Sequence, residues 1–248
     1  MRVLGLDIGS RSVDAVWLED GCIVGHAIAD SGFDPAAAYE AFLARGDHDI
    51  VVATGYGRHI ARETLGCPVV TEIKAYALGA ATLHPLAASV LDIGGQDTKV
   101  ITLKPEGGVS DFEMNDKCAA GTGKFLEVMA RALGFELGEM SAAALSAESG
   151  VAISSMCTVF AESEVTGLVH KGTDRARIAR GLHDSISART LGSLRRIGAT
   201  GPLVFAGGVA KNAAMVELVR AGFGGEVVVP EEAQIVGAYG AALSALPQ

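Results

Sequence analysis

Two cysteines have the sequence context of metal ligands, because each stands just before a predicted helix. Cys118 opens the run Cys-Ala-Ala-Gly-Thr-Gly-Lys, and Cys157 lies in Ser-Met-Cys-Thr. Iron–sulfur clusters and structural zinc sites are commonly held by four thiolates. One chain offers two well-placed thiolates and cannot close such a site by itself. A symmetric dimer supplies two more, so two chains can share one cluster on their two-fold axis.

Two alternatives remain open for these cysteines. A shared zinc site would use the same four thiolates, and unpaired cysteines are often buried core residues. Cys22 follows a turn and Cys67 precedes Pro68, without the Cys-x-x-Cys pairing of zinc fingers or ferredoxins. We expect both to be structural, as small apolar side chains. A disulfide framework is not expected in a chain of 248 residues with cytosolic thiols.

Three glycine-bearing segments at strand ends have the character of phosphate contacts. Asp7-Ile8-Gly9-Ser10 and Asp92-Ile93-Gly94-Gly95 are each expected at a hairpin tip, and Gly207-Gly208 stands between a predicted strand and a helix. Glycine lets the backbone approach a phosphate, and a helix start favours an anion. A single Asp-x-Gly is weak evidence, since glycine is common in turns. Three such sites, two of them duplicates, favour nucleotide binding.

The carboxylates of these hairpins suggest ATP hydrolysis. Asp7 and Asp92, approaching from opposite halves, can hold Mg²⁺ through its waters and orient an attacking water. Gln96 can donate to the γ-phosphate or help to place that water. We therefore predict that Asp7, Asp92 and Gln96 are catalytic.

The hydrophobic pattern predicts alternating strands and helices. The expected strands are 3–8, 12–19, 22–29, 50–54, 69–71, 88–93, 98–103, 109–115, 202–206 and 226–229, and the expected helices are 35–44, 59–65, 73–83, 121–134, 141–148, 159–169, 174–197, 212–221 and 234–246. A three-strand meander that opens with Asp-x-Gly occurs twice, which indicates an internal duplication. We expect an α/β fold of two subdomains, 1–86 and 87–248, with the last helix packing back on the first.

Composition narrows the class of protein. About half of the residues are apolar, 49%, which predicts a globular protein with a real core. A net charge of −9 without a basic run argues against nucleic acid as a partner. No window is apolar enough to span a bilayer, and the start lacks a signal-peptide core. We expect a cytoplasmic protein with no membrane association.

These motifs resemble the acetate- and sugar-kinase, heat-shock-chaperone and actin superfold, which is built from two duplicated ribonuclease-H-like subdomains. Within it, the chain is more specifically similar to the activators of 2-hydroxyacyl-CoA dehydratases, a family that includes the ATP-binding subunits of benzoyl-CoA reductase. The segments that carry the specific resemblance are 115–123 and 155–163, and others are 5–10, 54–58, 91–97, 205–212 and 237–243. Generic sugar kinases lack the first two.

The resemblance implies an ATPase coupled to electron transfer. It implies a homodimer with one four-iron four-sulfur cluster, ligated by Cys118 and Cys157 of each chain, and ATP with Mg²⁺ as further cofactors. ATP binding and hydrolysis would change the angle between helices near the cluster and drive one low-potential electron into a cluster-bearing partner. That partner would be a 2-hydroxyacyl-CoA dehydratase-like enzyme, and a ferredoxin or flavodoxin would be the electron source. Helix starts behind both cysteines would direct partial positive charge at the anionic cluster.

The resemblance also places the nucleotide. The residues expected to bind it are Gly9, Ser10, Arg11, Ser12, Gly94, Gly95, Gln96, Gly207, Gly208, Lys211 and Gln234. Two departures stand out: family members often carry Lys where this chain has Asp14, and the segment 72–77 lacks a His often seen there. Arg11 or Lys211 would compensate for the missing lysine.

Other functions and roles stay open at this stage. The chain could serve a benzoyl-CoA-reductase-like or double-cubane cluster system, or be a small-molecule kinase with structural cysteines, although no acceptor-binding carboxylate motif is found. Asn212 would cap the following helix or bind the nucleotide. Glu162 and Glu164 would form a docking surface or a solvated helix face. The sequence favours surface positions for the histidines at 59, 84, 170 and 183.

Overall fold

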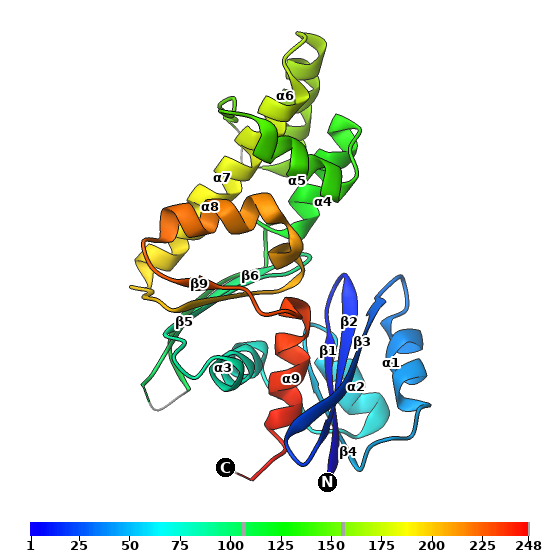
Figure 1. Ribbon diagram of the computed structural model, residues 1–248. Coiled ribbons are helices and arrows are strands. Elements are labelled where there is room, and N and C mark those ends of the chain that lie inside the picture. Colours follow the sequence, from blue (N-terminus) through cyan, green and yellow to red (C-terminus); the bar gives the residue numbers. More distant parts are fainter. Residues whose placement is uncertain (106–107, 155–156, 248) are drawn as a thin grey trace.

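The computed structural model describes residues 1–105, 108–154 and 157–247, and it places them in two sheets with helices around them (Figure 1). The first sheet has the order β3-β2-β1-β4 and the second has the order β7-β6-β5-β8-β9. In both sheets the first three strands form an antiparallel meander, and the next strand pairs in parallel with the first one. This common order confirms the duplicated α/β architecture expected from the sequence.

The first half supplies one sheet and three helices. Its elements are β1 (Arg2–Ile8), β2 (Ser12–Glu19), β3 (Cys22–Asp30), α1 (Pro35–Leu43), β4 (Ile50–Thr54), α2 (Arg58–Leu65) and α3 (Glu72–Leu83). β1 and β2 are almost entirely buried, whereas β3 alternates between exposed and partly covered residues as an edge strand does. The expected strand at 69–71 is reduced to an isolated bridge between Val69 and Ala53.

The second half contributes the larger, helix-rich part. Its elements are β5 (Ser89–Ile93), β6 (Thr98–Leu103), β7 (Val109–Asn115), α4 (Gly123–Leu133), α5 (Leu137–Ser146), α6 (Thr158–His170), α7 (Arg175–Arg196), β8 (Leu203–Ala206), η1 (Gly208–Lys211), α8 (Ala213–Phe223), β9 (Val227–Val228), η2 (Ala233–Ile235) and α9 (Val236–Leu243). Helices α4 to α7 extend away from the sheet, and Figure 1 shows α6 at the far end of the molecule. The helix expected at 141–148 begins earlier in the structure, because Glu136 and Glu139 form a capping box that starts α5 at Leu137.

Two helices that are far apart in the sequence, α3 and α9, meet between the sheets. α9 packs on β1, β2 and β4, while α3 packs on both α9 and the second sheet. Their approach is close because both helices present glycine: a Cβ at Gly240 would lie 1.8 Å from the carbonyl oxygen of Ala75. A Cβ at Gly5 would likewise lie 2.0 Å from the carbonyl oxygen of Ala238. These contacts set how closely α9 lies against α3 and β1.

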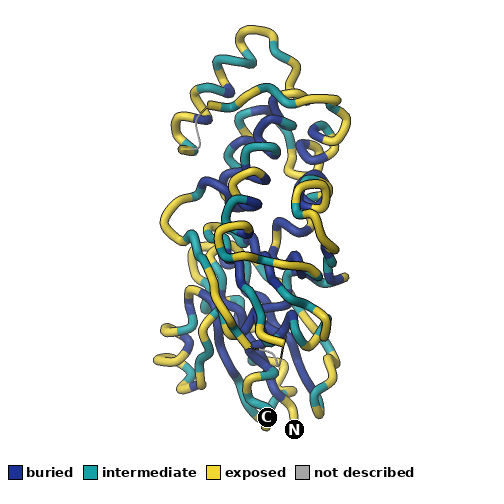
Figure 2. Tube along the Cα trace, turned by 90° about the vertical axis from the view of Figure 1, so that its left-hand side faces the viewer, coloured by how far each residue is buried: buried dark blue, intermediate teal, exposed yellow. Residues whose placement is uncertain are grey.

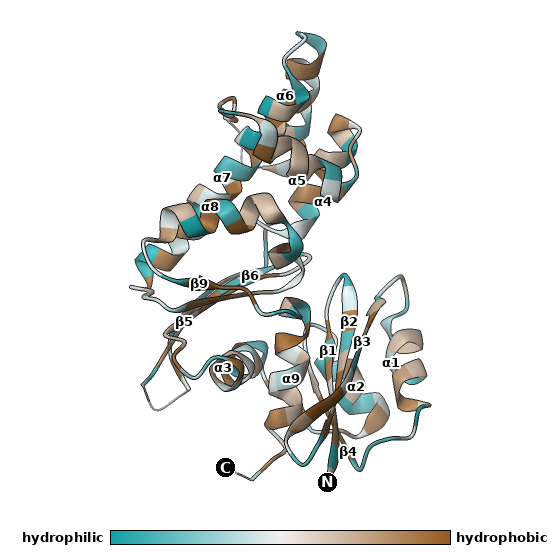
Figure 3. Cartoon of the chain, viewed as in Figure 1, coloured by the Kyte–Doolittle hydropathy of each residue, from teal (hydrophilic) through white to brown (hydrophobic). Residues whose placement is uncertain are grey.

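The core follows this arrangement. The largest apolar cluster lies under α4, α5, α7 and α8 on the second sheet and includes Phe125, Met129, Ile178 and Phe205. The buried segments form the inner strands, and exposed residues line the outer helices and loops (Figure 2). Apolar residues line the inner strands and α9, and polar residues follow the outer helix faces (Figure 3). Among the helices of the described residues, none combines the length and apolar character needed to cross a bilayer.

Candidate nucleotide and metal-ligand site

The tips of the two hairpins have the same local structure. The amide of Gly9 donates to the carbonyl oxygen of Ser12 at 2.9 Å, and the amide of Gly94 donates to the carbonyl oxygen of Asp97 at 3.0 Å. Each glycine follows the first strand of its sheet directly, at the position that the sequence predicted. Ser10 and Gln96 are exposed at the two tips, where their donors can meet a ligand. The duplication therefore includes the backbone hydrogen bond that closes each hairpin tip.

Asp7 is buried at the end of β1, and its carboxylate has no hydrogen bond or ion pair with another side chain of the described residues. The carboxylate is packed closely: Cβ atoms added at Gly55 and Gly237 would lie 2.5 Å and 2.1 Å from its two oxygens. Burial raises the pKa of Asp7 well above its ordinary value, and the neighbouring charge of Asp14 adds to the effect. A carboxylate in this setting gains from a cation or a proton.

Asp92 is the corresponding residue of the second half, and it is completely buried. Its Oδ2 accepts from the Lys99 ammonium at 2.9 Å, whereas its Oδ1 has no hydrogen-bond partner within the described part of the chain. Burial raises the pKa of Asp92 to about 6, although Lys99 favours the charged form. An orphaned buried carboxylate oxygen is costly, and it fits a water or hydrated cation that is not part of the structure. The residues at this position thus suit the predicted Mg²⁺.

Lys99 has a role that the sequence analysis missed. It is buried and is surrounded by Asp92, Asp97 and Glu72, with Nζ 3.0 Å from Glu72 Oε2 and a shorter contact to Asp97. Arg58 contacts the other oxygen of Glu72 at 3.0 Å. The available signal was the spacing, since Asp92 and Lys99 are separated as Asp7 and Asp14 are. The reach of Glu72 from α3 had no signal in the sequence.

Asp14 occupies the place equivalent to Lys99 and has a different environment. It is buried, and it accepts from Gln234 Nε2 at 3.2 Å and from the Ser12 hydroxyl at 3.3 Å. Burial raises the pKa of Asp14 to about 7, against the effect of these two hydrogen bonds and the charge of Lys211. The Gln234 amide also donates to Ser12 Oγ at 2.8 Å. Ser12 and Gln234, both predicted to bind the nucleotide, therefore lie side by side and bind each other.

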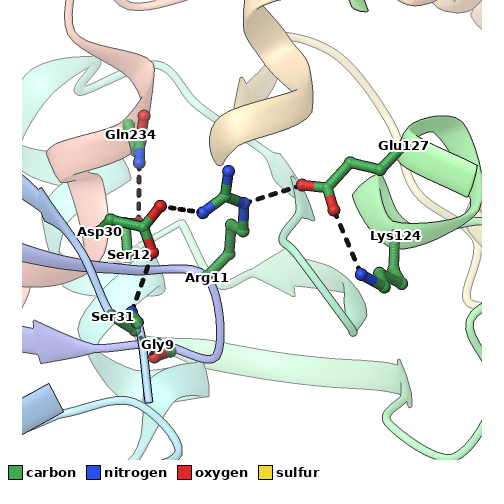
Figure 4. Close-up of polar contacts among 9 residues, drawn as sticks. Gly9, Arg11, Ser12, Asp30, Ser31, Lys124, Glu127 and Gln234 are labelled. Atoms are coloured by element: carbon green, nitrogen blue, oxygen red, sulfur yellow. Dashed lines mark hydrogen bonds and ion pairs between the residues drawn. The ribbon is translucent and has the colours of Figure 1, made fainter. Parts of the chain in front are cut away.

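Arg11 connects the first hairpin to the second half. Its guanidinium forms an ion pair with Asp30 and donates from Nε to Glu127 of α4 at 2.8 Å (Figure 4). Lys124 lies on the other side of the Glu127 carboxylate at 3.4 Å. The side chain was predicted to bind phosphate, and in the structure two carboxylates occupy it. A Cβ at Gly95 would lie 2.6 Å from the Cβ of Arg11, so the two hairpins are in contact here.

The third glycine segment lies against the second hairpin. Gly207 has a φ of 84°, and a Cβ there would lie 2.2 Å from Asp92 Oδ1. Its amide donates to the Ala233 carbonyl at 2.9 Å, which joins it to the turn that carries Gln234. Gly208 and Lys211 are exposed beside this turn. The structure thus brings together the second hairpin, Gly207 and the segment before α9.

Asn212 is the cap of α8, one of the two roles considered for it. Its Oδ1 accepts from the amide of Met215 at 3.0 Å and from the Ser141 hydroxyl at 3.0 Å. Its Nδ2 lies 3.1 Å from Nε2 of His183, whose Nδ1 lies 2.7 Å from the Ala179 carbonyl oxygen. The predicted surface position of His183 is wrong: the ring is fully buried, because α7 packs against α5 and α8 on this face. His59 and His170 are exposed and His84 is half-buried.

Cys118 and Cys157 are both exposed, so neither is a core thiol. Cys157 is the N-cap residue of α6, as predicted. Cys118 is not directly at a helix start, because α4 begins only at Gly123 and a loop intervenes. In the part of the chain that the structure describes, no group of three or more His, Cys, Asp or Glu side chains could hold a metal. The thiols of Cys118 and Cys157 are thus both open to contact from outside the chain.

The remaining cysteines differ from each other. Cys67 is buried in the core of the first half, as expected for a small apolar side chain. Cys22 is exposed, so its expected structural role is wrong: the residue begins the edge strand β3, where no layer covers it.

Glu164 accepts hydrogen bonds from the amide and hydroxyl of Ser154, which ties α6 to the segment before Cys157. The segment 155–163, which carries part of the family resemblance, begins with residues 155 and 156, and these two lie outside the described residues.

Known proteins of similar sequence cover the whole chain. It is 42% identical to the activator of lactoyl-CoA dehydratase of Anaerotignum propionicum over 99% of this chain and 97% of that protein. It is 39% identical to the (R)-2-hydroxyglutaryl-CoA dehydratase activating ATPase of Acidaminococcus fermentans, over 98% and 96%. One of the subunits of benzoyl-CoA reductase from Thauera aromatica is 34% identical, over 73% of this chain and 64% of that protein.

Solved structures agree with these relatives. Component A of the A. fermentans (R)-2-hydroxyglutaryl-CoA dehydratase superposes with a TM-score of 0.91 at 37% identity, over 98% of this chain and 97% of that one. The activator of the 2-hydroxyisocaproyl-CoA dehydratase from Clostridium difficile, with bound ADPNP, gives 0.89 at 37% identity, over 99% and 94%. A glucokinase of the ROK family from Streptomyces griseus, with a TM-score of 0.60 at 16% identity over 98% and 99%, shares the fold alone.

The sequence profile of one family matches nearly the full length of the chain, and the relatives above agree with it. Both hairpins, the glycine turn at Gly207 and the exposed Cys118 and Cys157 lie within the matched segment, residues 4–245. The chain belongs to the BadF/BadG/BcrA/BcrD ATPase family.

Proposed function

We propose that this protein is an ATP-dependent one-electron donor that activates a 2-hydroxyacyl-CoA dehydratase-like enzyme. The observation that carries the proposal is the position of Cys118: an exposed thiol in a loop that is hydrogen-bonded to one of the two phosphate hairpins. Relatives named as dehydratase activators match the chain almost from end to end. A nucleotide site beside an exposed thiol suits a protein that couples ATP to the transfer of an electron.

The nucleotide would lie between the hairpins and against the third glycine turn. Gly9, Gly94, Gly95, Gly207 and Gly208 would let phosphates approach the backbone, and Ser10, Ser12, Gln96 and Gln234 would donate hydrogen bonds. Asp7 and the unpartnered oxygen of Asp92 would hold the waters of Mg²⁺, and Gln96 would orient the attacking water. Arg11 and Lys211 would supply the positive charge that family members with a lysine in place of Asp14 have at that position.

The electron carrier requires two copies of the chain. Cys118 and Cys157 of each chain would together hold one four-iron four-sulfur cluster, which supplies the single electron. The exposure of both Cys118 and Cys157 supports a homodimer that shares the cluster, and free exposed thiols suit a reducing compartment such as the cytoplasm. We further propose the division into subdomains 1–86 and 87–248, with a ferredoxin or flavodoxin as the electron source.

The test is electron transfer that depends on ATP. The protein is purified without oxygen, reduced, and mixed with a 2-hydroxyacyl-CoA dehydratase of a related activator system, with and without Mg-ATP. We expect the dehydratase to become active only when both ATP and the reduced protein are present. Cys118→Ala should retain nucleotide binding and lose activation. A colourless, air-stable protein that phosphorylates a sugar or a carboxylate would instead identify a kinase.

A further inference from the structure

Helix α4 begins without a side-chain cap of its own. Thr122 is at the cap position, but its hydroxyl donates to the Ala119 carbonyl at 2.7 Å and caps no helical amide. The first helical amides donate outward: Gly123 to the Gly94 carbonyl at 2.9 Å, and Lys124 to the Gly95 carbonyl at 2.7 Å. Helix starts leave such amides unsatisfied unless another group accepts from them. The second phosphate hairpin is therefore the cap of α4.

The loop before α4 is held by the same hairpin and its neighbouring strand. Thr98 of β6 donates from its hydroxyl to the Gly121 carbonyl at 2.8 Å. Asn115 of β7 donates from Nδ2 to the carbonyl oxygens of Cys118 at 2.8 Å and of Ala120 at 3.2 Å. Thr98 and Asn115 are direct partners in the β6–β7 register. Thr98 and Asn115 therefore hold the loop that carries Cys118 at the carbonyl oxygens named above.

The junction leaves little room for independent movement. A Cβ at Gly123 would lie 3.0 Å from the Gly94 carbonyl oxygen and 3.5 Å from the Gly95 Cα, so the helix start and hairpin are in van der Waals contact. Packed groups of this kind move together or exchange partners. Gln96, at the exposed tip, is two residues from Thr98. If a ligand displaces the hairpin tip, the movement can therefore reach the loop of Cys118 through Thr98.

We propose that Thr98 and Asn115 are positioning residues that transmit the nucleotide state of the second hairpin to the loop of Cys118. The inference rests on the proposed function insofar as the nucleotide lies on this hairpin. It adds the residues through which ATP acts on Cys118. When the hairpin moves, the Thr98 hydroxyl and the Asn115 amide carry the carbonyls of Gly121 and Cys118 with them.

A purely structural pair predicts something different. If these side chains only stabilise the fold, their loss lowers thermal stability equally with and without nucleotide, and it leaves the response of Cys118 to nucleotide intact. If they transmit the nucleotide state, their loss leaves nucleotide binding in place and abolishes that response. The informative quantity is therefore a ratio of Cys118 reactivities, with nucleotide over without.

The test uses the full chain and one isosteric substitution. Thr98→Val removes the hydroxyl and keeps the β-branched shape. Thr102→Val is the matched control, because Thr102 lies on the same strand and its hydroxyl bonds the Asp111 backbone at the far end. Thr98→Ser restores the donor. Alkylation of Cys118 by iodoacetamide is timed by peptide mass spectrometry in the full chain before its cluster is reconstituted, with and without a non-hydrolysable ATP analogue and Mg²⁺, and the affinity for the analogue is measured separately.

In the wild type, Thr98→Ser and Thr102→Val, we expect the analogue to change the alkylation rate by about 2- to 10-fold, the range that one hydrogen bond accounts for. In Thr98→Val the ratio should fall to about 1 with affinity for the analogue unchanged. A Thr98→Val variant that keeps the wild-type ratio overturns the proposal, and so does a wild type that binds the analogue without any change at Cys118. A wild type that does not bind ATP refutes the proposed function itself, and the coupling with it. Iron release to a chelator from cluster-loaded protein should show the same pattern of ratios.

Discussion

Asp14 and Lys99 occupy the same position in the two copies of the duplicated hairpin, each directly opposite an aspartate. Asp7 faces Asp14 across β1 and β2, and Asp92 faces Lys99 across β5 and β6. The second copy therefore contains a buried ion pair, and the first contains two buried carboxylates. This difference between otherwise duplicated hairpins makes the two halves of the site electrostatically unlike each other.

Lys99→Met should strongly destabilise the protein. The substitution leaves the carboxylates of Asp92, Asp97 and Glu72 close together without their common cation. Removing one partner of a buried ion pair costs about 3–5 kcal/mol. Urea denaturation measures the free energy of unfolding, with Lys104→Met, at an exposed lysine, as the control. A loss below about 1 kcal/mol would show that the three carboxylates do not depend on Lys99.

Asp14→Asn should change how stability depends on pH. Because the pKa of Asp14 is about 7 in the fold and 3.8 ordinarily, the folded chain keeps a proton that the unfolded chain releases. Its contribution to stability is therefore present at low pH and is lost as pH rises towards about 7. Between about pH 5 and pH 8, the free energy of unfolding of the variant should therefore rise relative to that of the wild type by on the order of 2 kcal/mol.

The measurement for Asp14 is urea denaturation at several pH values. Asp47→Asn, at an exposed carboxylate, serves as the control and should leave the pH profile unchanged. If Asp14→Asn and wild type follow parallel profiles, the buried carboxylate is not protonated in the fold.

His183→Gln should act in the opposite direction. Burial lowers the pKa of His183 from its ordinary 6.5, so below that pH the unfolded chain takes up a proton that the folded chain refuses. Stability from the neutral ring is thus complete above about pH 6.5 and is lost as pH falls, by up to about 1.4 kcal/mol per pH unit. Glutamine can still accept from Asn212, so the variant should have a flatter profile from about pH 6.5 to pH 5.

Thermal unfolding across that pH range tests the prediction for His183. His59→Gln, at an exposed histidine, is the matched control and should keep the wild-type slope. A slope in His183→Gln as steep as in the wild type would assign the acid lability to other groups.

Arg11→Gln and Glu127→Gln should have opposite effects on nucleotide affinity. Glu127 holds the guanidinium that we expect to meet phosphate, so neutralising Glu127 frees Arg11, whereas removing Arg11 deletes the contact. We expect affinity for ATP to rise about 2-fold in the first case and fall about 5-fold in the second, within the range of an exposed charge pair. The ion pair is exposed, so neither variant should lose more than about 1 kcal/mol of stability.

Titration calorimetry with a non-hydrolysable ATP analogue measures both effects of the Arg11–Glu127 pair. Arg220→Gln disrupts a comparable surface pair with Glu217 and should leave affinity unchanged. Weaker binding in both hairpin-pair variants would mean that the pair itself, and not the free guanidinium, supports the nucleotide site.

The duplicated framework was readable from the sequence because its signals are local. Asp-x-Gly marks the end of a first strand in both halves, the alternating patterns mark the meanders, and Asn212 before an apolar run marks a helix cap. The ends of the hairpins and the start of α6 at Cys157 were predicted for the same reason. The fold class follows once two such halves are recognised.

The remaining features depend on contacts between distant residues. The burial of His183 arises from the packing of three helices, and a polar neighbourhood in sequence gives no sign of it. The charge cluster at Lys99 needs Glu72 from a helix of the other half, and α4 is capped by carbonyls of a hairpin tip that precedes it by two strands and a loop. Side-chain patterns do not encode such backbone partners, so the structure was required to find them.

The central claim concerns the cluster, and one measurement tests it most directly. Anaerobically purified protein, with its cluster reconstituted, is analysed for iron and acid-labile sulfide per chain while its mass in solution is determined. The account predicts a brown, air-sensitive dimer with about two iron and two sulfide per chain, and near-zero iron in Cys118→Ala and Cys157→Ala. A monomer free of iron, or a Cys118→Ala variant with its full iron content, would contradict it.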